Sequence, residues 1–513
     1  MQANDWTLHR ERICIPVRLN SSVQEQSIEL DYTLPDYFPD FFRLLHCFAE
    51  PRITAQKIAD GAVQYTLNVR LTVMYLAEQS AAVQAVTQTL TFQRSLPLSG
   101  DFDAAQCSVR LTPETAYLNC RAVNPRRIDL RGAVRIAAQV CCEQAVEVIG
   151  TAEGKYLQTR SEPVSFVSQI MRSEKQFTLS EDITIPETQP AMLSPLREQV
   201  RLRVTETRIV AGKLVVKGEA DVQILYTSSD GISQITAVFP FSQIMEGEGI
   251  SEQMPHTVTA VQIDRLLTPE ADGSGDLRLL HLDIQIMLYC SFLRSANAEL
   301  LMDAYSTRLP CEASRTALSL MTAPTTVKES AQMKIQLSQP DAVLTKVYAA
   351  WAIPNGMTAE LDENGTLMVS GTLRCCVLAA DAENRPIMLE KTEAVSWQAE
   401  SLQVGEELPA AEITSCEYTL NGSDSVSLLV GIACSGEVMQ QQQYTLITEI
   451  TEQDADSTPE RDYALRLYFG QTGESLWEIA KRYRTAAAAI REENDCAGDT
   501  LTAPQMLLIP SVK

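Results

Sequence analysis

A long strand pattern occurs three times in this chain, and this repeat constrains the fold more than any other feature. The copies follow Gly61, Gly212 and Gly365, which are spaced about 150 residues apart and align without gaps over the strand after each glycine. In the first copy, residues 63–75, apolar and polar side chains alternate almost perfectly. Such alternation is typical of a half-buried strand with one face on a core. The sequence therefore predicts three copies of one β-rich unit.

Each of these glycines lies where the chain must reverse before the strand. Asp60-Gly61 and Asn364-Gly365 are hairpin signals, because both residue types tolerate a positive φ. A second, fainter hairpin follows in each copy, at residues 118–136, 260–288 and 413–433. The predicted fold class is therefore mainly β, with three tandem, sandwich-like repeats of antiparallel hairpins. Strand order alone does not fix the sheet topology within a repeat.

A proline segment precedes the first hairpin of two copies. It reads apolar-Pro-acid-x-x-Pro at residues 34–39 and 185–190, whereas the third copy keeps Pro340-Asp341. Apolar residues follow the segment in each case, which predicts an extended stretch that leads into a short helix. We interpret these segments as structural connections into each unit, with a binding groove as the alternative.

The last fifty residues follow a different pattern, of strand, helix, helix and strand. Ser475 and Glu478 form the S-x-x-E pattern of a capping box after a strand-like run, and Thr485 can cap a second helix that ends at Asn494. A short apolar strand closes the module. The residues with the spacing to pack the helices on the strands are Leu476, Ile479, Ala480, Tyr483, Ile490, Leu507 and Ile509.

This C-terminal module resembles the LysM family, because the string GESLWEIAKRY, residues 473–483, is very close to that family's core pattern. The resemblance implies a small βααβ binding module that contacts its ligand through the loop after the first strand and the loop before the second. These loops hold Gly473, Glu474, Ser475, Leu476, Asn494, Asp495, Pro504 and Gln505. Trp477 follows the first loop and is either an exposed anchor for a partner or a partly buried helix residue.

The module departs from the family pattern in two places. Glu474 stands where aspartate is usual, and Pro504 stands where glycine is common. A proline fixes φ and removes an amide donor, and the glycan-binding loops of the family depend on backbone amides and carbonyls. The departure at Pro504 therefore argues against binding of N-acetylglucosamine.

The repeats and the module divide the chain into five predicted segments. The repeats are expected at residues 1–165, 166–315 and 316–450, and the LysM module at 463–513. Residues 451–462 contain five acidic side chains, one proline and no large apolar residue. That composition predicts an extended, solvated linker.

The rest of the chain carries a second resemblance. The Leu-Pro-Asp segment at residues 34–39, the Asn-Pro-Arg-Arg string at 124–127 and the three β-rich repeats that end in LysM resemble the SipL-type, SPOCS-domain spore-coat morphogenetic proteins of clostridia. The resemblance implies a mother-cell cytoplasmic protein that is recruited to the forespore surface, where the spore coat assembles. It also implies a protein partner, the coat-basement ATPase of the SpoIVA type.

Composition narrows the choice of partner. The net charge of -24 and the pI of about 4.7 argue against nucleic acid and against an anionic membrane surface. Residues 1–462 carry the whole excess, so the neutral LysM module is the expected contact surface, although the acidity can also serve solubility alone. The N-terminus lacks the apolar core of a secretory signal, and no apolar run approaches the ~18 residues of a membrane span. A cytoplasmic location and no transmembrane segment are therefore expected.

The chain has no recognisable catalytic pattern. Its four histidines, His9, His46, His256 and His281, are not at metal-ligand spacing, and the 13 cysteines include no C-x-x-C pair. No phosphate-binding loop of the Walker type occurs. We therefore expect no enzyme activity, no cofactor and no metal, and we interpret His46 as a core or interface residue and most cysteines as small buried hydrophobes.

Two functions remain from these observations. The first is a non-catalytic protein of spore-envelope and coat morphogenesis that binds the coat-basement ATPase through its LysM module. The alternative is a LysM protein that binds peptidoglycan, a polymer containing N-acetylglucosamine, in the cell wall or spore cortex.

Overall fold

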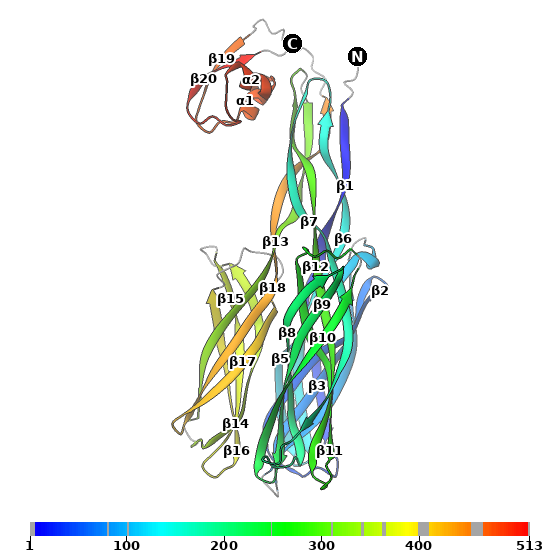
Figure 1. Cartoon of the computed structure of the whole chain (residues 1–513), viewed down its shortest axis with the longest axis vertical. Helices are drawn as coiled ribbons and strands as arrows, with labels where there is room; N and C mark the ends of the chain where they lie inside the picture. Colours follow the sequence, from blue (N-terminus) through cyan, green and yellow to red (C-terminus); the bar gives the residue numbers. More distant parts are fainter. Residues whose placement is uncertain are drawn as a thin grey trace.

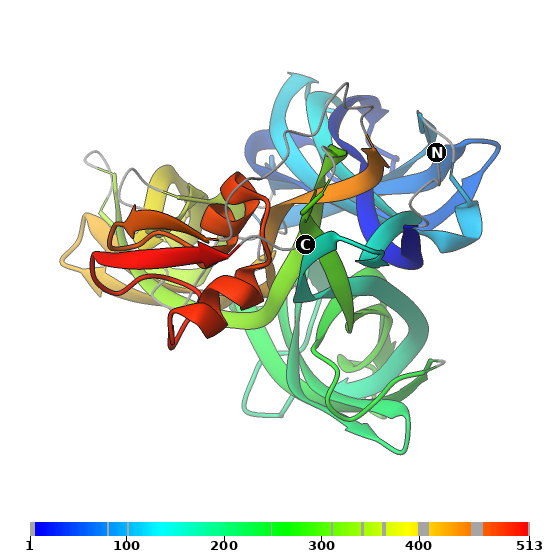
Figure 2. The same ribbon diagram turned by 90° about the horizontal axis from the view of Figure 1, so that it is seen from above.

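The structure is a computed structural model, and it describes residues 6–78, 82–99, 102–247, 249–308, 311–339, 343–361, 366–398, 410–452 and 465–510. Strands dominate these residues, in three similar units at one end of an elongated molecule (Figure 1). Seen from above, the three units lie around a common centre (Figure 2). The mainly β, repeated architecture predicted from the sequence is confirmed.

Unit 1 contains two antiparallel sheets of three strands. Their orders are β1-β6-β5 and β2-β3-β4. The strands are β1 (Thr7–Thr33), β2 (Phe41–Ala59), β3 (Ala62–Ala77), β4 (Val83–Pro97), β5 (Cys107–Asn124) and β6 (Arg127–Glu153), and a 3-10 turn, Ala104–Gln106, precedes β5.

Units 2 and 3 repeat this arrangement, with sheet orders β11-β12-β7, β10-β9-β8, β13-β18-β17 and β14-β15-β16. The strands of unit 2 are β7 (Leu157–Thr184), β8 (Ser194–Val210), β9 (Lys213–Ser228), β10 (Gly231–Glu246), β11 (His256–Ala271) and β12 (Leu277–Ser306). Those of unit 3 are β13 (Cys311–Ser338), β14 (Lys346–Leu361), β15 (Leu367–Ala380), β16 (Pro386–Gln398), β17 (Ala410–Asn421) and β18 (Ser425–Glu452).

The predicted hairpin turns join β2 to β3 in unit 1 and β8 to β9 in unit 2. Asp60 and Gly61 have φ of 53° and 69°, and Ala211 and Gly212 have φ of 51° and 75°. Consecutive residues with positive φ make the tight turn whose twist suits two paired strands. The third of these turns, at residues 364 and 365, lies outside the described residues.

Alternation along β3 and its counterparts builds the core of each unit. Val63, Leu67 and Val69 are fully buried, and they pack on Ile128 and Leu130 of the facing sheet. Since burial of one such side chain stabilises by about 1.5–3 kcal/mol, each unit holds its two sheets together as a sandwich. The expectation that most cysteines are small buried hydrophobes is wrong for the described residues: Cys107 and Cys142, direct partners on β5 and β6, form a disulfide, and among the others only Cys141, Cys290, Cys375 and Cys376 are buried.

The proline segments lead into strands rather than helices, so the predicted short helix is wrong. In unit 1, Arg126 donates to the carbonyl oxygens of Leu34 (3.2 Å) and Pro35 (2.9 Å) and closes the segment as a turn, and β2 follows at Phe41. Arg278 binds the equivalent segment of unit 2 through the carbonyl oxygens of Pro186 and Gln189. These bonds support the interpretation of the first two segments as structural connections. Pro340 and Asp341 of the third segment lie outside the described residues.

Six strands are much longer than the sequence pattern indicated. β1, β6, β7, β12, β13 and β18 have 27 to 30 residues each, and they pair as β1/β6, β7/β12 and β13/β18. At about 3.3 Å per residue, such a ribbon extends about 90 Å, well beyond one sandwich. The ends of the three ribbons pack together as a stalk (Figure 1), whose core includes Ile13, Ile15, Val148, Phe166, Leu300, Leu320 and Leu446.

The three units also share an apolar junction on the outer faces of the β3, β9 and β15 sheets. Equivalent positions of the repeat, Met74, Leu225 and Leu378, meet there and are buried. Trp351 lies among them, 1% exposed, with its ring 5.4 Å from that of Phe48. The junction and the stalk therefore hold the repeats as one assembly.

The strand pairing bears on the predicted domain boundaries. Residue 165 lies within β7 and residue 315 lies within β13, and both strands pair along their length with partners of their own unit. We therefore propose that the boundaries lie between β6 and β7 and between β12 and β13. Of the predicted linker, Thr451 and Glu452 end β18, and the rest lies outside the described residues.

The C-terminal module has the predicted βααβ order, with β19 (Leu465–Gly470), α1 (Leu476–Tyr483), α2 (Ala487–Glu493) and β20 (Gln505–Pro510). Ser475 caps α1 by accepting a bond from the Trp477 amide. Thr485 does not cap α2, because its hydroxyl donates instead to the Pro510 carbonyl at 2.7 Å. The predicted core packs as expected, with Tyr483 partly buried.

Among the described residues, no helix is long and apolar enough to cross a membrane.

Replacing Trp351 with alanine is expected to loosen the junction. The cavity should cost about 3–5 kcal/mol, and unit 3 should separate partly from units 1 and 2. Small-angle scattering should then report a larger radius of gyration for the variant. Trp397→Ala is the control, because Trp397 packs on the core of unit 3 itself. An unchanged scattering profile for Trp351→Ala would contradict this role of the junction.

Candidate functional site

The structure brings the two predicted loops of the LysM module together. The Gly473 amide donates to the Leu501 carbonyl at 2.8 Å, and the Leu501 amide donates to the Glu474 carbonyl at 2.9 Å. The Leu476 amide also donates to the Asp499 carbonyl at 2.8 Å. The loop after β19 and the segment before β20 are therefore neighbours, as a two-loop site requires.

Glu474 stabilises the first loop. Its carboxylate accepts bonds from the Tyr468 hydroxyl (2.8 Å) and from the Gln471 amide (2.8 Å). These two donors, the amide first, lower the pKa of Glu474. The longer side chain that replaces aspartate thus reaches back to the start of the turn.

The predicted site residues divide into supporting and accessible ones. Leu476 is fully buried, and Asn494 bonds Leu508 through both its amide and its carbonyl groups (2.8 and 2.6 Å). These two side chains hold the loops in place. Ser475 is half-buried as the helix cap, and the exposed positions are Gly473, Asp495, Pro504 and Gln505.

Trp477 contacts the body of the protein, as a partly buried helix residue. Its indole nitrogen donates to Oδ2 of Asp303 at 2.8 Å, and its ring packs edge-on against Tyr305 at 4.9 Å. Both partners lie on β12, at the stalk. The guanidinium of Arg160 lies 5.7 Å from the centre of the Trp477 ring. The module is therefore docked on the stalk through α1.

Asp303 is the centre of this docking contact, which we define as Asp303, Tyr305, Trp477 and Lys481. The side chain of Asp303 is 7% exposed, and its carboxylate accepts bonds from Lys481 (2.7 Å) and from Arg315 (2.6 Å). The Tyr305 hydroxyl donates to the Thr485 carbonyl at 2.7 Å, and the Tyr305 ring joins the module's own core. Polar and apolar groups of the stalk thus complete the packing of the module.

Electrostatics favours the ionised form of Asp303. Burial alone raises the pKa of this carboxyl, but the hydrogen bonds from Lys481 and Trp477 and the charges of Lys481 and Arg315 outweigh it, so the pKa lies below its ordinary value. A buried carboxylate with several donors is stable, whereas loss of one partner leaves an unpaired charge.

Sequence reasoning missed an apolar patch on the outer face of the module's sheet. We define the apolar patch as Leu467, Phe469 and Met506, whose exposed fractions are 65%, 57% and 63%. Phe469 and Met506 are direct cross-strand partners on β19 and β20. The sequence contained a signal for this patch. Leu467 and Phe469 alternate with inward-facing Tyr468, so both faces of the strand carry large apolar side chains, and one of the two faces must be exposed.

A cavity of about 270 Å³ lies between units 1 and 2. Arg265, Glu50 and Glu198 in its lining pair with each other, whereas Arg197 stacks on the rings of Phe48 and Trp351. Arg265 binds Glu50 at 2.9 Å and Glu198 at 3.3 Å. Such mutual pairing is typical of a structural contact between units, and the cavity therefore adds no reactive group to the candidate site.

Two family models match the chain. The model described as SipL, SPOCS domain, matches residues 193–266, from the start of β8 into β11 of unit 2. The LysM domain model matches residues 471–510, from the loop after β19 to the end of β20. Both families are non-catalytic binding domains, and they fit a sporulation protein that carries a peptidoglycan-binding-like module. No curated protein and no solved structure matches the chain.

Replacement of Asp303 by asparagine should release the module from the stalk. The change removes a buried negative charge that three donors share, and breaking such a pair costs about 3–5 kcal/mol. Hydrogen exchange of α1 should rise, and small-angle scattering should report a wider range of module positions. Asp129→Asn is the matched control, because Asp129 bonds Arg121 and Arg131 within unit 1. A module that stays protected in Asp303→Asn would refute the docking contact.

Docking should weaken in acid. The pKa of Asp303 is lower in the docked state than in the released state, so the docked state holds fewer protons. The stabilisation is complete above the ordinary carboxyl range, about pH 4, and is lost as the pH falls through the lowered pKa. Hydrogen exchange of α1 across pH 2 to 6 would measure this loss. If docking in Asp303→Asn depended on pH in the same way, groups other than Asp303 would be responsible for the loss in acid.

Proposed function

Because the chain is a SPOCS-plus-LysM protein of the SipL type, we propose that it is a non-catalytic protein of spore-coat morphogenesis. In this proposal the protein acts in the mother-cell cytoplasm and is recruited to the forespore surface. Its LysM module binds the coat-basement ATPase of the SpoIVA type. The three SPOCS-like units form the body that carries and orients this module.

The exposed apolar patch is the observation that carries the proposal. Leu467, Phe469 and Met506 present three large apolar side chains to solvent on a module of fewer than fifty residues. Exposed apolar groups that gather on one face are typical of protein–protein interfaces. The docking contact covers α1, whereas these side chains on β19 and β20 stay exposed in the docked state.

The neutral charge of the module also supports a protein partner. The body carries the excess negative charge of the chain, whereas the module presents apolar and mixed-charge surface. The neutral module limits electrostatic repulsion of a partner where contact is made. The acidic body repels other acidic proteins.

Peptidoglycan remains the alternative ligand, because the two loops that bind glycans in the LysM family are neighbours here. Gly473, Asp495 and Gln505 are exposed along them. Pro504 has no amide to offer a sugar at this place, which favours the protein partner. A binding role for the predicted site residues on these loops is therefore proposed, with either a protein or peptidoglycan as the ligand.

The apolar patch is expected to contribute directly to capture of the coat ATPase. Phe469→Asp should weaken capture by about tenfold or more, since an exposed aromatic anchor is lost and a charge enters the contact. Affinity would be measured by a pulldown or by interferometry with the purified ATPase. Val238→Asp is the control, because Val238 is also 57% exposed but lies on β10 of unit 2.

The same proteins separate the two candidate functions. The unmodified chain should bind the ATPase and should stay in solution with insoluble peptidoglycan. Retention on peptidoglycan at micromolar protein, with no capture of the ATPase, would establish the alternative. Equal ATPase binding by Phe469→Asp and the unmodified chain would place the partner surface elsewhere.

A further inference from the structure

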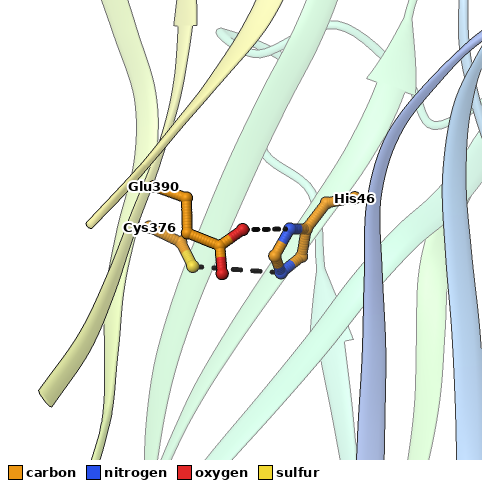
Figure 3. Close-up of side chains that lie close together, drawn as sticks. All are labelled: His46, Cys376 and Glu390. Carbon is orange, nitrogen blue, oxygen red and sulfur yellow. Dashed lines mark hydrogen bonds and ion pairs between the residues drawn. The ribbon is translucent and has the colours of Figure 1, made fainter. Parts of the chain in front are cut away.

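Three metal-binding side chains of different types meet between units 1 and 3. His46 comes from β2, and Cys376 and Glu390 come from the neighbouring strands β15 and β16 and point toward it (Figure 3). One ligand atom from each side chain lies within 4.8 Å of the other two. Nδ1 of His46 is 3.3 Å from Oε2 of Glu390, and Nε2 is 3.9 Å from Sγ of Cys376.

Local structure brings these three side chains together. Cys376 and Glu390 are direct cross-strand partners, so their side chains stand on the same face of the sheet. A register shift between Leu44 and His46 interrupts the alternation of β2 just before the histidine. The ring of His46 then packs edge-on against Phe48 at 4.5 Å.

The adjacent cysteines of unit 3 face opposite sides of β15. Cys375 packs in the sandwich core of unit 3, whereas Cys376 belongs to the junction between the units. If residue 376 only filled space in the junction, a small apolar side chain would serve there as well as cysteine. A buried thiol beside a buried imidazole and a carboxylate is instead the donor set of a transition metal.

We propose that His46, Cys376 and Glu390 bind one Zn²⁺ ion that joins unit 3 to unit 1. In a tetrahedral zinc site, a sulfur and a nitrogen ligand lie about 3.5 Å apart, given bonds of about 2.3 and 2.0 Å. The observed separation of 3.9 Å between Sγ and Nε2 is a few tenths of an ångström longer. Oε2 of Glu390 faces Nδ1 in this structure, so binding of one ion through Nε2 requires the Glu390 carboxylate and the Cys376 thiol to shift toward that nitrogen.

Charge and burial suit the ion. The side chains of His46 and Cys376 are 6% and 0% exposed, whereas that of Glu390 is 42% exposed and leaves access for water as a fourth ligand. A thiolate and a carboxylate together match the two charges of Zn²⁺, and Arg374, 3.8 Å from Oε1 of Glu390, adds one positive charge at the edge of the site. Zinc binds the thiolate form of cysteine, so the proton of the Cys376 thiol passes to solvent when the ion binds.

Such an ion would stabilise the contact between two repeats that are far apart in the sequence. His46 and Cys376 are separated by 330 residues, and the hydrophobic junction lies beside them. The inference is independent of the LysM module, so its failure leaves the proposed function untouched.

The test is a zinc titration of the full chain after removal of metal with a chelator. The unmodified protein should bind one zinc ion per chain, measured by equilibrium dialysis and elemental analysis. Cys376→Ser and Glu390→Gln should each weaken binding by about tenfold or more. Cys290→Ser is the matched control, because Cys290 is also a buried free cysteine but lies in unit 2.

Absorption spectroscopy with Co²⁺ in place of Zn²⁺ gives a second readout, which reports directly whether a thiolate binds the metal. Co²⁺ in the site should show a thiolate-to-metal charge-transfer band in the unmodified chain and in Cys290→Ser, and the band should be lost in Cys376→Ser. A metal-free chain that is folded by circular dichroism and binds no zinc would overturn the inference and leave a His46–Glu390 ion pair only. Zinc binding that is unchanged in Cys376→Ser and Glu390→Gln would also overturn it.

Discussion

The pairing of six very long strands into three antiparallel ribbons determines the rest of the structure. Each ribbon, β1/β6, β7/β12 and β13/β18, belongs to a sandwich at one end and to the stalk at the other. Because a paired strand cannot bend freely without losing its ladder, the ribbons fix the directions of all three units. They also bring the end of β18 to the end of the molecule at which the LysM module lies (Figure 1).

A single buried carboxylate then positions the module. Asp303 joins Lys481 and the Trp477 indole of the module to Arg315 of the stalk, and Tyr305 adds an apolar contact. Polar contacts of this kind fix an orientation more sharply than apolar packing, because each donor has a preferred direction. The module therefore presents its loops and its apolar patch in a defined direction while α1 is covered.

Part of the fold and of the candidate site could be predicted from the sequence. The features that depend on local residues were predicted, and those that depend on distant contacts were not. The alternation at residues 63–75 and the turn at Asp60 and Gly61 are local, so they gave the repeat and the sandwich class correctly. The stalk was missed because its strands pair over long separations. The helix expected after Pro39 failed because Arg126, distant in sequence, closes that turn. The direction of Trp477 and the meeting of His46 with Cys376 depend likewise on tertiary contacts.

In the proposed function, this stalked assembly brings a protein-binding LysM module to the surface of a developing spore. The most direct measurement is the location of a fluorescent fusion of the full chain in sporulating clostridial cells. The account predicts a ring around the forespore that becomes diffuse when the coat-basement ATPase is absent. A diffuse signal in cells that contain the ATPase, or accumulation at the cell wall, would contradict it.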